Sequence, residues 1–155
     1  MKVGIILYSQ TGNTLSVAEK LKESISKKHH VTIERIEVED KSIPRKNPFK
    51  LKTLPSIDNY DILIFGSLVE AFSLSPVTKD YLKQINSLKD KKVLLYVTEH
   101  FPKPWLGGNH AIKQMKKIVE RKDGNILDTK VINWGSNKRE DMINDLVIKF
   151  SNYLK

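Results

Sequence analysis

The chain has 155 residues, 39% of them hydrophobic and 29% charged, which suits one domain, residues 1–155, with a single buried core. It contains no cysteine, so disulfides, thiol nucleophiles and cysteine-held iron–sulfur clusters are excluded. The formal net charge of +9 would steer acidic partners or nucleic acid toward the protein; because the lysines are scattered over predicted helix faces and loops, we expect a solvated basic surface and no specific nucleic-acid binding.

A short apolar run opens the chain. Residues 2–8 are apolar and bounded by turn residues, which predicts a strand buried on both faces of a sheet. The run is too short to span a membrane and no small-residue cleavage site follows it, so we expect no membrane span and a cytoplasmic location. An amphipathic helix is predicted next, because apolar residues recur at spacings of three and four at Leu15, Ala18, Leu21 and Ile25.

The middle of the chain alternates strands with less regular segments. Residues 31–38 are rich in β-branched side chains and predict a second strand. Residues 39–60 contain three prolines and no sustained period, which predicts a long surface connection with one short helical turn. Residues 61–66 predict a third strand, followed by a loop through Ser73. A helix then begins near Pro76, with apolar positions at Val77, Tyr81, Leu82 and Ile85.

The last third continues the alternation. Residues 92–98 predict a fourth strand and residues 126–134 a weaker fifth. Helices follow each of them, with apolar positions at Ile112, Met115, Ile118 and Val119 and then at Met142, Leu146, Val147, Phe150 and Leu154.

This element order predicts a doubly wound α/β fold. Parallel neighbouring strands need crossover helices, and right-handed crossovers place those helices on both faces of the sheet. Ligands of such sheets bind beyond the carboxyl ends of the strands. We therefore expect the functional site in three loops, residues 9–14, 67–73 and 99–109.

The first of these loops has the composition of an anion site. Ser9-Gln-Thr-Gly-Asn-Thr14 places hydroxyls, amides and a glycine at the start of the first helix. Free backbone amides, the helix dipole and side-chain donors from Ser9, Thr11, Asn13 and Thr14 would surround a phosphate without a lysine or arginine. The alternative is that these residues only cap the helix; one cap needs one such residue and four are present, so we favour binding.

Other phosphate sites with a similar element order do not fit. The Walker pattern ends in Gly-Lys-Ser/Thr and the dinucleotide fingerprint needs three spaced glycines, and neither occurs in this loop. A phospho-acceptor receiver domain would need acidic residues where the chain has Tyr8-Ser9 and Gly66-Ser67.

The same loop carries a family resemblance. Residues 9–14 after an apolar strand resemble the phosphate loop of the flavodoxin family, matching its Ser/Thr-x-Thr-Gly-x-Thr pattern at every specified position. Residues 65–76 and 101–112 extend the resemblance, which covers essentially the whole chain. It implies a flavodoxin-like three-layer fold, with five parallel strands in the order 2-1-3-4-5 and helices on both faces.

The resemblance also implies flavin mononucleotide (FMN) as the cofactor. The phosphate would be held by Ser9, Gln10, Thr11, Gly12, Asn13 and Thr14. The isoalloxazine ring would be flanked by Ser67, Leu68, Val69, Glu70, Ala71, Phe72, Thr98, Glu99, His100, Phe101 and Trp105.

The second loop departs from the family pattern. Related loops often carry a proline and an aromatic residue where this chain has Leu68 and Glu70. Phe72, Phe101 and Trp105 are then the aromatic candidates to cover the ring, and Trp105 either covers it or folds back onto the sheet edge. Residues 107–109 are interpreted as a turn with Asn109 as the N-cap of the next helix. His29-His30 receives no function.

These observations lead to three functional hypotheses. The preferred one is an FMN-binding electron-transfer protein with a redox partner protein of acidic surface, in which no side chain acts as a catalyst and no metal is bound. The second is an FMN-dependent oxidoreductase that takes hydride from NAD(P)H and passes it to a quinone or another small acceptor. The third is a flavodoxin-fold binding module without flavin.

Overall fold

A central parallel sheet organises the protein. The computed structural model describes residues 1–39 and 50–155. Its main sheet has the strand order β2-β1-β5-β7-β8, formed by His30–Arg35, Lys2–Leu7, Ile62–Glu70, Lys92–Glu99 and Asn125–Asn133. All four pairings along this path are parallel. In chain order these are the predicted strands 2-1-3-4-5, so the predicted fold class is confirmed.

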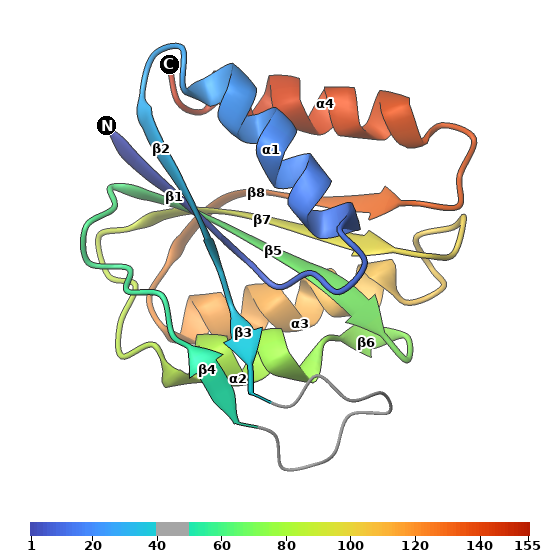
Figure 1. The fold of residues 1–155 in the computed structure, drawn as a ribbon, viewed down its shortest axis with the longest axis horizontal. Coiled ribbons are helices and arrows are strands. Elements are labelled where there is room, and N and C mark those ends of the chain that lie inside the picture. The colour runs from blue at the N-terminus through green and yellow to red at the C-terminus, as the bar shows by residue number, and fades with distance from the viewer. Residues whose placement is uncertain (40–49) are drawn as a thin grey trace.

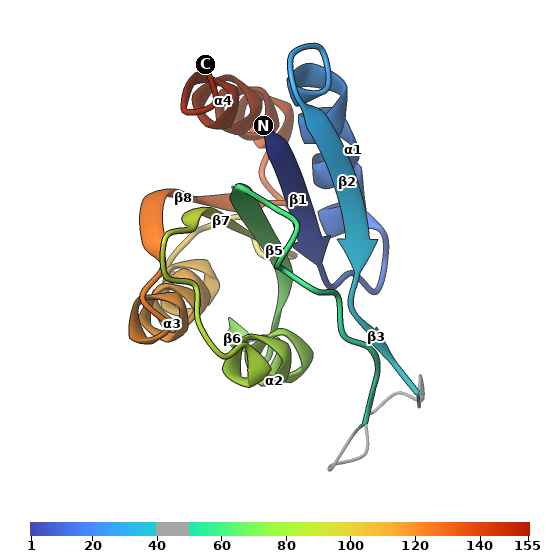
Figure 2. The ribbon, with the colours of Figure 1, turned by 90° about the vertical axis from the view of Figure 1, so that its left-hand side faces the viewer.

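Within the described residues, four helices cover the two faces of the sheet (Figures 1 and 2). Helices α1 (Asn13–Ile25) and α4 (Arg139–Asn152) lie on one face, and α2 (Pro76–Gln84) and α3 (Gly108–Arg121) on the other. Each face has its own apolar cluster of buried side chains. The helices therefore form where apolar residues recur at spacings of three and four, because each helix buries its apolar face against the sheet. No helix in the described ranges is long and apolar enough to cross a membrane.

The segment around the third strand differs from the expectation. Strand β5 continues to Glu70 and turns back into β6 (Ser73–Leu74), with Val69 opposite Leu74. The predicted loop 67–73 is thus mostly a hairpin, because Leu68 and Val69 extend the strand while the polar residues beside them mimic a loop. Ile85, predicted inside the following helix, is its extended C-cap residue.

The second strand and the long connection also differ. The predicted strand 31–38 is divided at Ile36 into β2 and β3 (Glu37–Val38), and β3 pairs antiparallel with β4 (Leu51–Thr53). Figure 2 shows this small ribbon extending away from the helical layers. Within the described part of the connection, residues 50–60, there is a strand and no helical turn; the remainder, 40–49, lies outside the described residues.

One glycine in the central strand makes room for a buried ring. Gly66 lies in register between Leu7 and Tyr96, and a Cβ built on it would overlap the Tyr96 ring. Tyr96 is fully buried, and its hydroxyl donates a hydrogen bond to the carbonyl oxygen of Thr14 at 2.8 Å. Because Gly66 has no side chain, the Tyr96 ring can lie over strand β5, and its hydroxyl can reach the first turn of α1.

We predict that Gly66→Ala lowers the free energy of unfolding by about 1 to 3 kcal/mol, the usual cost of overpacking a core. Urea unfolding followed by circular dichroism measures this change. In a Tyr96→Ala background the same substitution should cost much less, because the ring that it meets is gone. Equal losses in both backgrounds would show that Gly66 does not serve the tyrosine.

Candidate functional site

The three predicted loops meet at one pocket. A cavity of about 320 Å³ lies at the carboxyl ends of β1, β5 and β7. The first loop, the end of β5 and the end of β7 line it, through Ser9, Gln10, Thr11, Asn13, Thr14, Leu68, Val69, Thr98, Glu99 and His100. The topology rule that directed attention to these loops thus brings together residues from all three.

The first loop leaves the amino end of α1 open. Gly12 is the N-cap residue, with φ +93°, and its own position offers no capping side chain. A Cβ at Gly12 would meet no atom within 4 Å, so the glycine is needed for its left-handed backbone and not for close packing. No acidic residue lies in the first turn. The helix therefore presents uncapped amides and a positive dipole end, which is the requirement for an anion site.

The hydroxyl groups of the loop do not act as a simple helix cap. The Ser9 Oγ accepts a hydrogen bond from the Gly12 amide at 3.2 Å, which shapes the loop before the helix. The Ser16 hydroxyl donates to the carbonyl oxygen of Asn13 at 2.8 Å. No side chain of the loop caps α1, so the capping alternative considered from the sequence is not what this geometry shows.

Two buried contacts fix the first turn of α1 to strand β7. The hydroxyls of Thr14 and Thr98 lie 2.8 Å apart, and the Tyr96 hydroxyl reaches the Thr14 carbonyl oxygen. Thr14 and Thr98 are almost completely buried. Whichever threonine accepts in this pair keeps its own hydrogen available, so the pair retains one donor in a pocket that both residues line.

A cation lies beside the loop that sequence reasoning described as free of lysine and arginine. The guanidinium of Arg35 donates to the carbonyl oxygen of Ser9 at 3.4 Å. Arg35 is the last residue of β2 and lies in register with Leu7, two residues before Ser9. The predicted topology already implied that Arg35 ends beside this loop, because adjacent parallel strands end at the same edge of a sheet. Arg35 was missed from the sequence because it is far from the loop along the chain.

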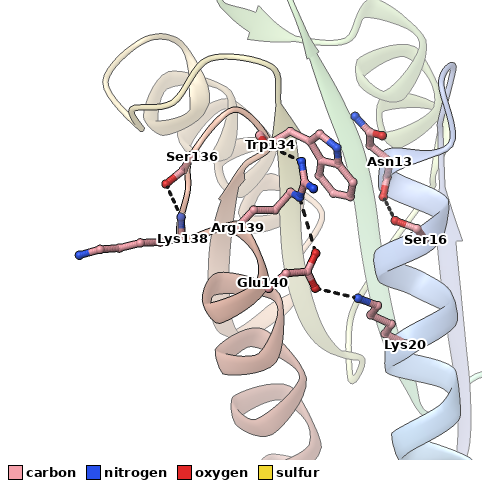
Figure 3. A network of polar contacts seen from close by, with 8 residues as sticks. All are labelled: Asn13, Ser16, Lys20, Trp134, Ser136, Lys138, Arg139 and Glu140. Carbon is pink, nitrogen blue, oxygen red and sulfur yellow. Dashed lines mark hydrogen bonds and ion pairs between the residues drawn. The ribbon is translucent and has the colours of Figure 1, made fainter.

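A polar network holds α4 against α1 near this edge (Figure 3). Lys20 on α1 pairs with Glu140 on α4 at 3.2 Å, and the pair lowers the pKa of the Glu140 carboxyl, chiefly through the hydrogen bond from Lys20. The Arg139 guanidinium lies 4.9 Å from the centre of the Trp134 ring and donates to the Trp134 carbonyl oxygen. These contacts set the two helices side by side with their amino ends at the same edge of the sheet.

A buried carboxyl lies behind the third loop. Glu99 is 3% exposed, and its Oε1 accepts a hydrogen bond from the Asn133 amide, which also donates to the Phe101 carbonyl oxygen at 3.3 Å. Its other oxygen, Oε2, has no hydrogen-bond partner within the described structure. Burial raises the pKa of Glu99, opposed by hydrogen bonds from the Gly108 amide and Asn133. The Glu99 and Asn133 pair thus ties the ends of β7 and β8 to the start of the third loop.

The remaining predicted site residues lie outside the pocket lining. The Ser67 hydroxyl is turned toward α2, 2.6 Å from that of Thr78. Glu70, Ala71 and Phe72 form the tip of the β5–β6 hairpin, where Ala71 and Phe72 have positive φ. Phe72 stacks on Phe101, with ring centroids 5.2 Å apart.

Trp105 does not fold back onto the sheet edge, which was one of its two predicted alternatives; the other, that it covers the flavin ring, stays a prediction. Its side chain is 70% exposed and carries the Lys103 ammonium 5.7 Å from its ring centre, so it neither lines the pocket nor folds onto the sheet edge. The predicted N-cap at Asn109 is wrong as well, because Gly107 is the N-cap residue of α3 and Asn109 lies within its first turn. The chain reaches the helix through Gly107 at φ +116°, packed against the Phe72 backbone.

A wider hollow lies at the opposite, amino edge of the sheet. Its volume is about 820 Å³, and residues around the first strand and the α1–β2 turn line it, among them Lys2, Lys28, His29, His30 and Asp61. His29 is engaged by the Leu154 carbonyl oxygen. Among the described residues no group of three histidine or acidic side chains could hold a metal ion. The chemistry expected from the sequence therefore converges on the smaller pocket at the carboxyl edge.

Comparison with known proteins identifies the relatives of this chain. Residues 4–139 match the model of the flavodoxin domain. A flavodoxin of Streptococcus pneumonia TIGR4 has a TM-score of 0.69 at 12% identity, covering 99% of both chains. Oxidised flavodoxin 2 of Bacillus cereus has a TM-score of 0.69 at 18% identity, also over 99% of both chains. Fusobacterium nucleatum flavodoxin bound to flavin mononucleotide has a TM-score of 0.63 at 15% identity over 98% of both. No curated protein sequence matches.

We predict that substitutions at Thr14 and Thr98 have strongly non-additive effects on the free energy of unfolding. Either Thr14→Val or Thr98→Val leaves one buried hydroxyl without its partner and should lower the free energy of unfolding by about 1 to 3 kcal/mol. The double variant removes both hydroxyls and should lose little more than one single variant. Urea unfolding measures all three, with the exposed Thr53→Val as a control expected within about 0.5 kcal/mol of the parent. Additive losses in the double variant would contradict the hydroxyl pair.

A second prediction concerns the pH dependence of stability. Because the pKa of Glu99 is raised in the folded protein, the folded state binds more protons than the unfolded chain above pH about 4.5, the ordinary value of this group. The contribution of Glu99 to the free energy of unfolding therefore falls as pH rises from there toward the raised pKa. Glu99→Gln should gain stability relative to the parent as pH rises from 4.5 to 8 in urea titrations.

A variant of opposite sign is the control for this experiment. The lowered pKa of Glu140 stabilises the folded state at pH values above 4.5, its ordinary pKa, and this contribution is lost as pH falls below that value. Glu140→Gln should therefore lose a little stability relative to the parent as pH rises toward 4.5, and change little from pH 4.5 to 8. A stability difference between Glu99→Gln and the parent that stays constant with pH would show that Glu99 keeps an ordinary pKa.

Proposed function

The chain belongs to the flavodoxin family, and from this premise we propose that it is a cytoplasmic FMN-binding protein that passes electrons to a partner protein. The observation that carries the proposal is the open amino end of α1. Uncapped amides follow a left-handed glycine at the wall of a pocket that the three predicted loops share. The site is thus equipped for an anion and has space beside it for the rest of a ligand.

The donor set fits a phosphate monoester. Amides of the first turn of α1 and the side chains of Ser9, Thr11 and Asn13 supply neutral donors, and Arg35 adds a cation beside the loop. A phosphate dianion suits such a site, because the dipole end and the amides stabilise negative charge without a permanent ion pair. In this proposal the loop 9–14 binds the phosphate of FMN.

The walls beyond the phosphate loop fit the flavin. Leu68 and Val69 give an apolar side, while Thr98, Glu99 and His100 give the polar side. Bound FMN would supply reversible electron transfer, and the protein's own residues bind it, orient it and limit the access of water. Glu70, Ala71, Phe72, Phe101 and Trp105 do not line this pocket, so contact between them and the flavin ring stays a prediction.

One observation supports a second candidate, an FMN-dependent NAD(P)H oxidoreductase. The pocket lining in the described structure contains no phenylalanine, tyrosine or tryptophan. A flavin covered by Leu68 and Val69 alone would leave room for a flat second substrate. Rapid bleaching of the bound flavin by NADPH or NADH, followed by reoxidation with a quinone, would favour the reductase; bleaching only by a reduced protein or by dithionite favours the carrier.

The absorption spectrum of the purified protein tests cofactor binding directly. After incubation with excess FMN and removal of free flavin, we expect the visible flavin bands to stay with the protein. A colourless protein after this treatment would favour the third hypothesis, a flavodoxin-fold module without flavin.

We predict that one charge in the phosphate loop separates FMN from riboflavin. Asparagine and aspartate both tolerate the left-handed backbone of Gly12, so Gly12→Asn and Gly12→Asp differ mainly in one negative charge. Gly12→Asp should bind FMN about 10- to 100-fold more weakly than Gly12→Asn, because its carboxylate repels the phosphate. Flavin fluorescence titration measures both ligands. Riboflavin, which has no phosphate, should bind the two variants equally; an equal loss for both flavins would place the phosphate elsewhere.

A further inference from the structure

Three exposed aromatic side chains lie on the β5–β6 hairpin tip and on the third loop, two segments that come directly after pocket-lining residues. Phe72 is 55% exposed, Phe101 39% and Trp105 70%. Phe72 and Phe101 stack face to face, and Phe101 follows His100, which lines the pocket and contacts the Phe101 ring edge-on. We call Phe72, Phe101 and Trp105 the aromatic patch. Large apolar side chains grouped on a surface mark a place where another molecule binds.

The backbone that presents this patch is held in an unfavourable conformation. Ala71 and Phe72 occupy the left-handed region at φ 49° and 63°, which costs about 1 kcal/mol or more for each residue that is not glycine. The Gln114 side-chain oxygen on α3 accepts hydrogen bonds from Ser73 and Leu74, and these fix the hairpin against the helix. Phe72 is thus displayed from a rigid tip, as expected of a surface prepared for binding.

A row of unpaired basic side chains continues from the patch along α3. The exposed residues of this helix recur at spacings of three and four. The basic residues among them, together with Lys103 in the preceding loop, form what we call the basic stripe: Lys103, Lys113, Lys116, Lys117 and Arg121. Within the described ranges none of the five forms an ion pair, and Glu120 is the one acidic residue on that helix face. Lys113 lies about 8 Å along the helix from Gly108, so the stripe begins close to the patch.

We propose that the aromatic patch and the basic stripe together form the docking surface for an acidic electron-transfer protein. The inference rests on the proposed function and names its partner class. Unpaired positive charge steers an acidic surface to this side, and the aromatic patch gives the short-lived complex its apolar centre. A partner seated there covers the mouth of the pocket, which electron transfer requires; a nucleic acid bound to the stripe would gain nothing from that position.

A matched pair of acceptors tests the charge of the partner. Native cytochrome c is basic, and succinylation of its lysines makes the same protein acidic. We expect the FMN-loaded, dithionite-reduced protein to reduce the succinylated form faster in stopped-flow measurements, with a rate constant that falls about tenfold between 10 and 200 mM NaCl. A faster reaction with native cytochrome c, or no dependence on salt, would overturn the proposal.

Two triple variants of equal charge test the location. Lys113→Glu/Lys116→Glu/Lys117→Glu changes the stripe, whereas Lys27→Glu/Lys28→Glu/Lys92→Glu changes exposed lysines at the amino edge of the sheet, away from the pocket. Each set lowers the formal net charge of +9 by six units. We expect the first set to slow reduction of succinylated cytochrome c about tenfold or more, and the second by less than about threefold. Equal losses would show that only the net charge matters.

The aromatic patch is tested without a change of charge. Trp105→Ser should lower the rate about threefold while leaving the salt dependence intact, because it removes the apolar ring and keeps every charge of the basic stripe, although Lys103 loses the ring that it contacts. An unchanged rate would remove Trp105 from the docking surface.

A binding measurement separates this proposal from the proposed function. Calorimetric titration of the protein without flavin against both cytochromes should give tighter binding to the succinylated form, weakened by the stripe variant. This result would support the surface even if the chain took up no FMN. Tighter binding of a single-stranded RNA oligonucleotide than of succinylated cytochrome c, lost in the stripe variant, would overturn the assignment to an acidic protein.

Discussion

The buried ring of Tyr96, which lies over Gly66, joins the phosphate loop and helix α1 to the central sheet. Tyr96 extends over Gly66 in the central strands and bonds the backbone of Thr14, and the Thr14 and Thr98 hydroxyls add a second buried contact between α1 and β7. Burial raises the pKa of the Tyr96 hydroxyl far above its ordinary range, which favours the protonated form that donates this hydrogen bond. The amino end of α1 is therefore fixed relative to the sheet before any ligand binds. A preformed array of amides needs no reorganisation to receive an anion.

The distribution of charge separates binding from recognition of partners. The pocket lining is polar but carries few ionisable groups, and the positive charge of the chain lies mainly outside it. Arg35 beside the loop is the exception that adds to the field of the helix dipole. In our proposal the FMN cofactor supplies the redox chemistry, while the protein surface selects the partner. The net charge of +9 then matters for encounter and not for chemistry.

Sequence patterns predicted what depends on local spacing and on topology. The strand order and the meeting of three loops follow from alternating strands and helices, because parallel strands end at one edge. The hairpin at 67–74 was missed because two polar residues in an extended strand resemble a loop. Long-range partners could not be read: Tyr96 and Thr14 are joined by the sheet, and Glu99 and Asn133 come from different strands. The position of Phe72 also depends on a left-handed backbone at the hairpin tip, which composition does not encode.

The phosphorus NMR spectrum of the protein with one equivalent of FMN tests the central claim most directly. A phosphate held by the amides and dipole of α1 is stabilised as the dianion, so its resonance should be shifted from that of free FMN and should stay constant from pH 5 to 8. A resonance that titrates near pH 6, as an unbound phosphate monoester does, would show that the loop 9–14 does not hold the phosphate, and that the open amino end of α1 has another purpose.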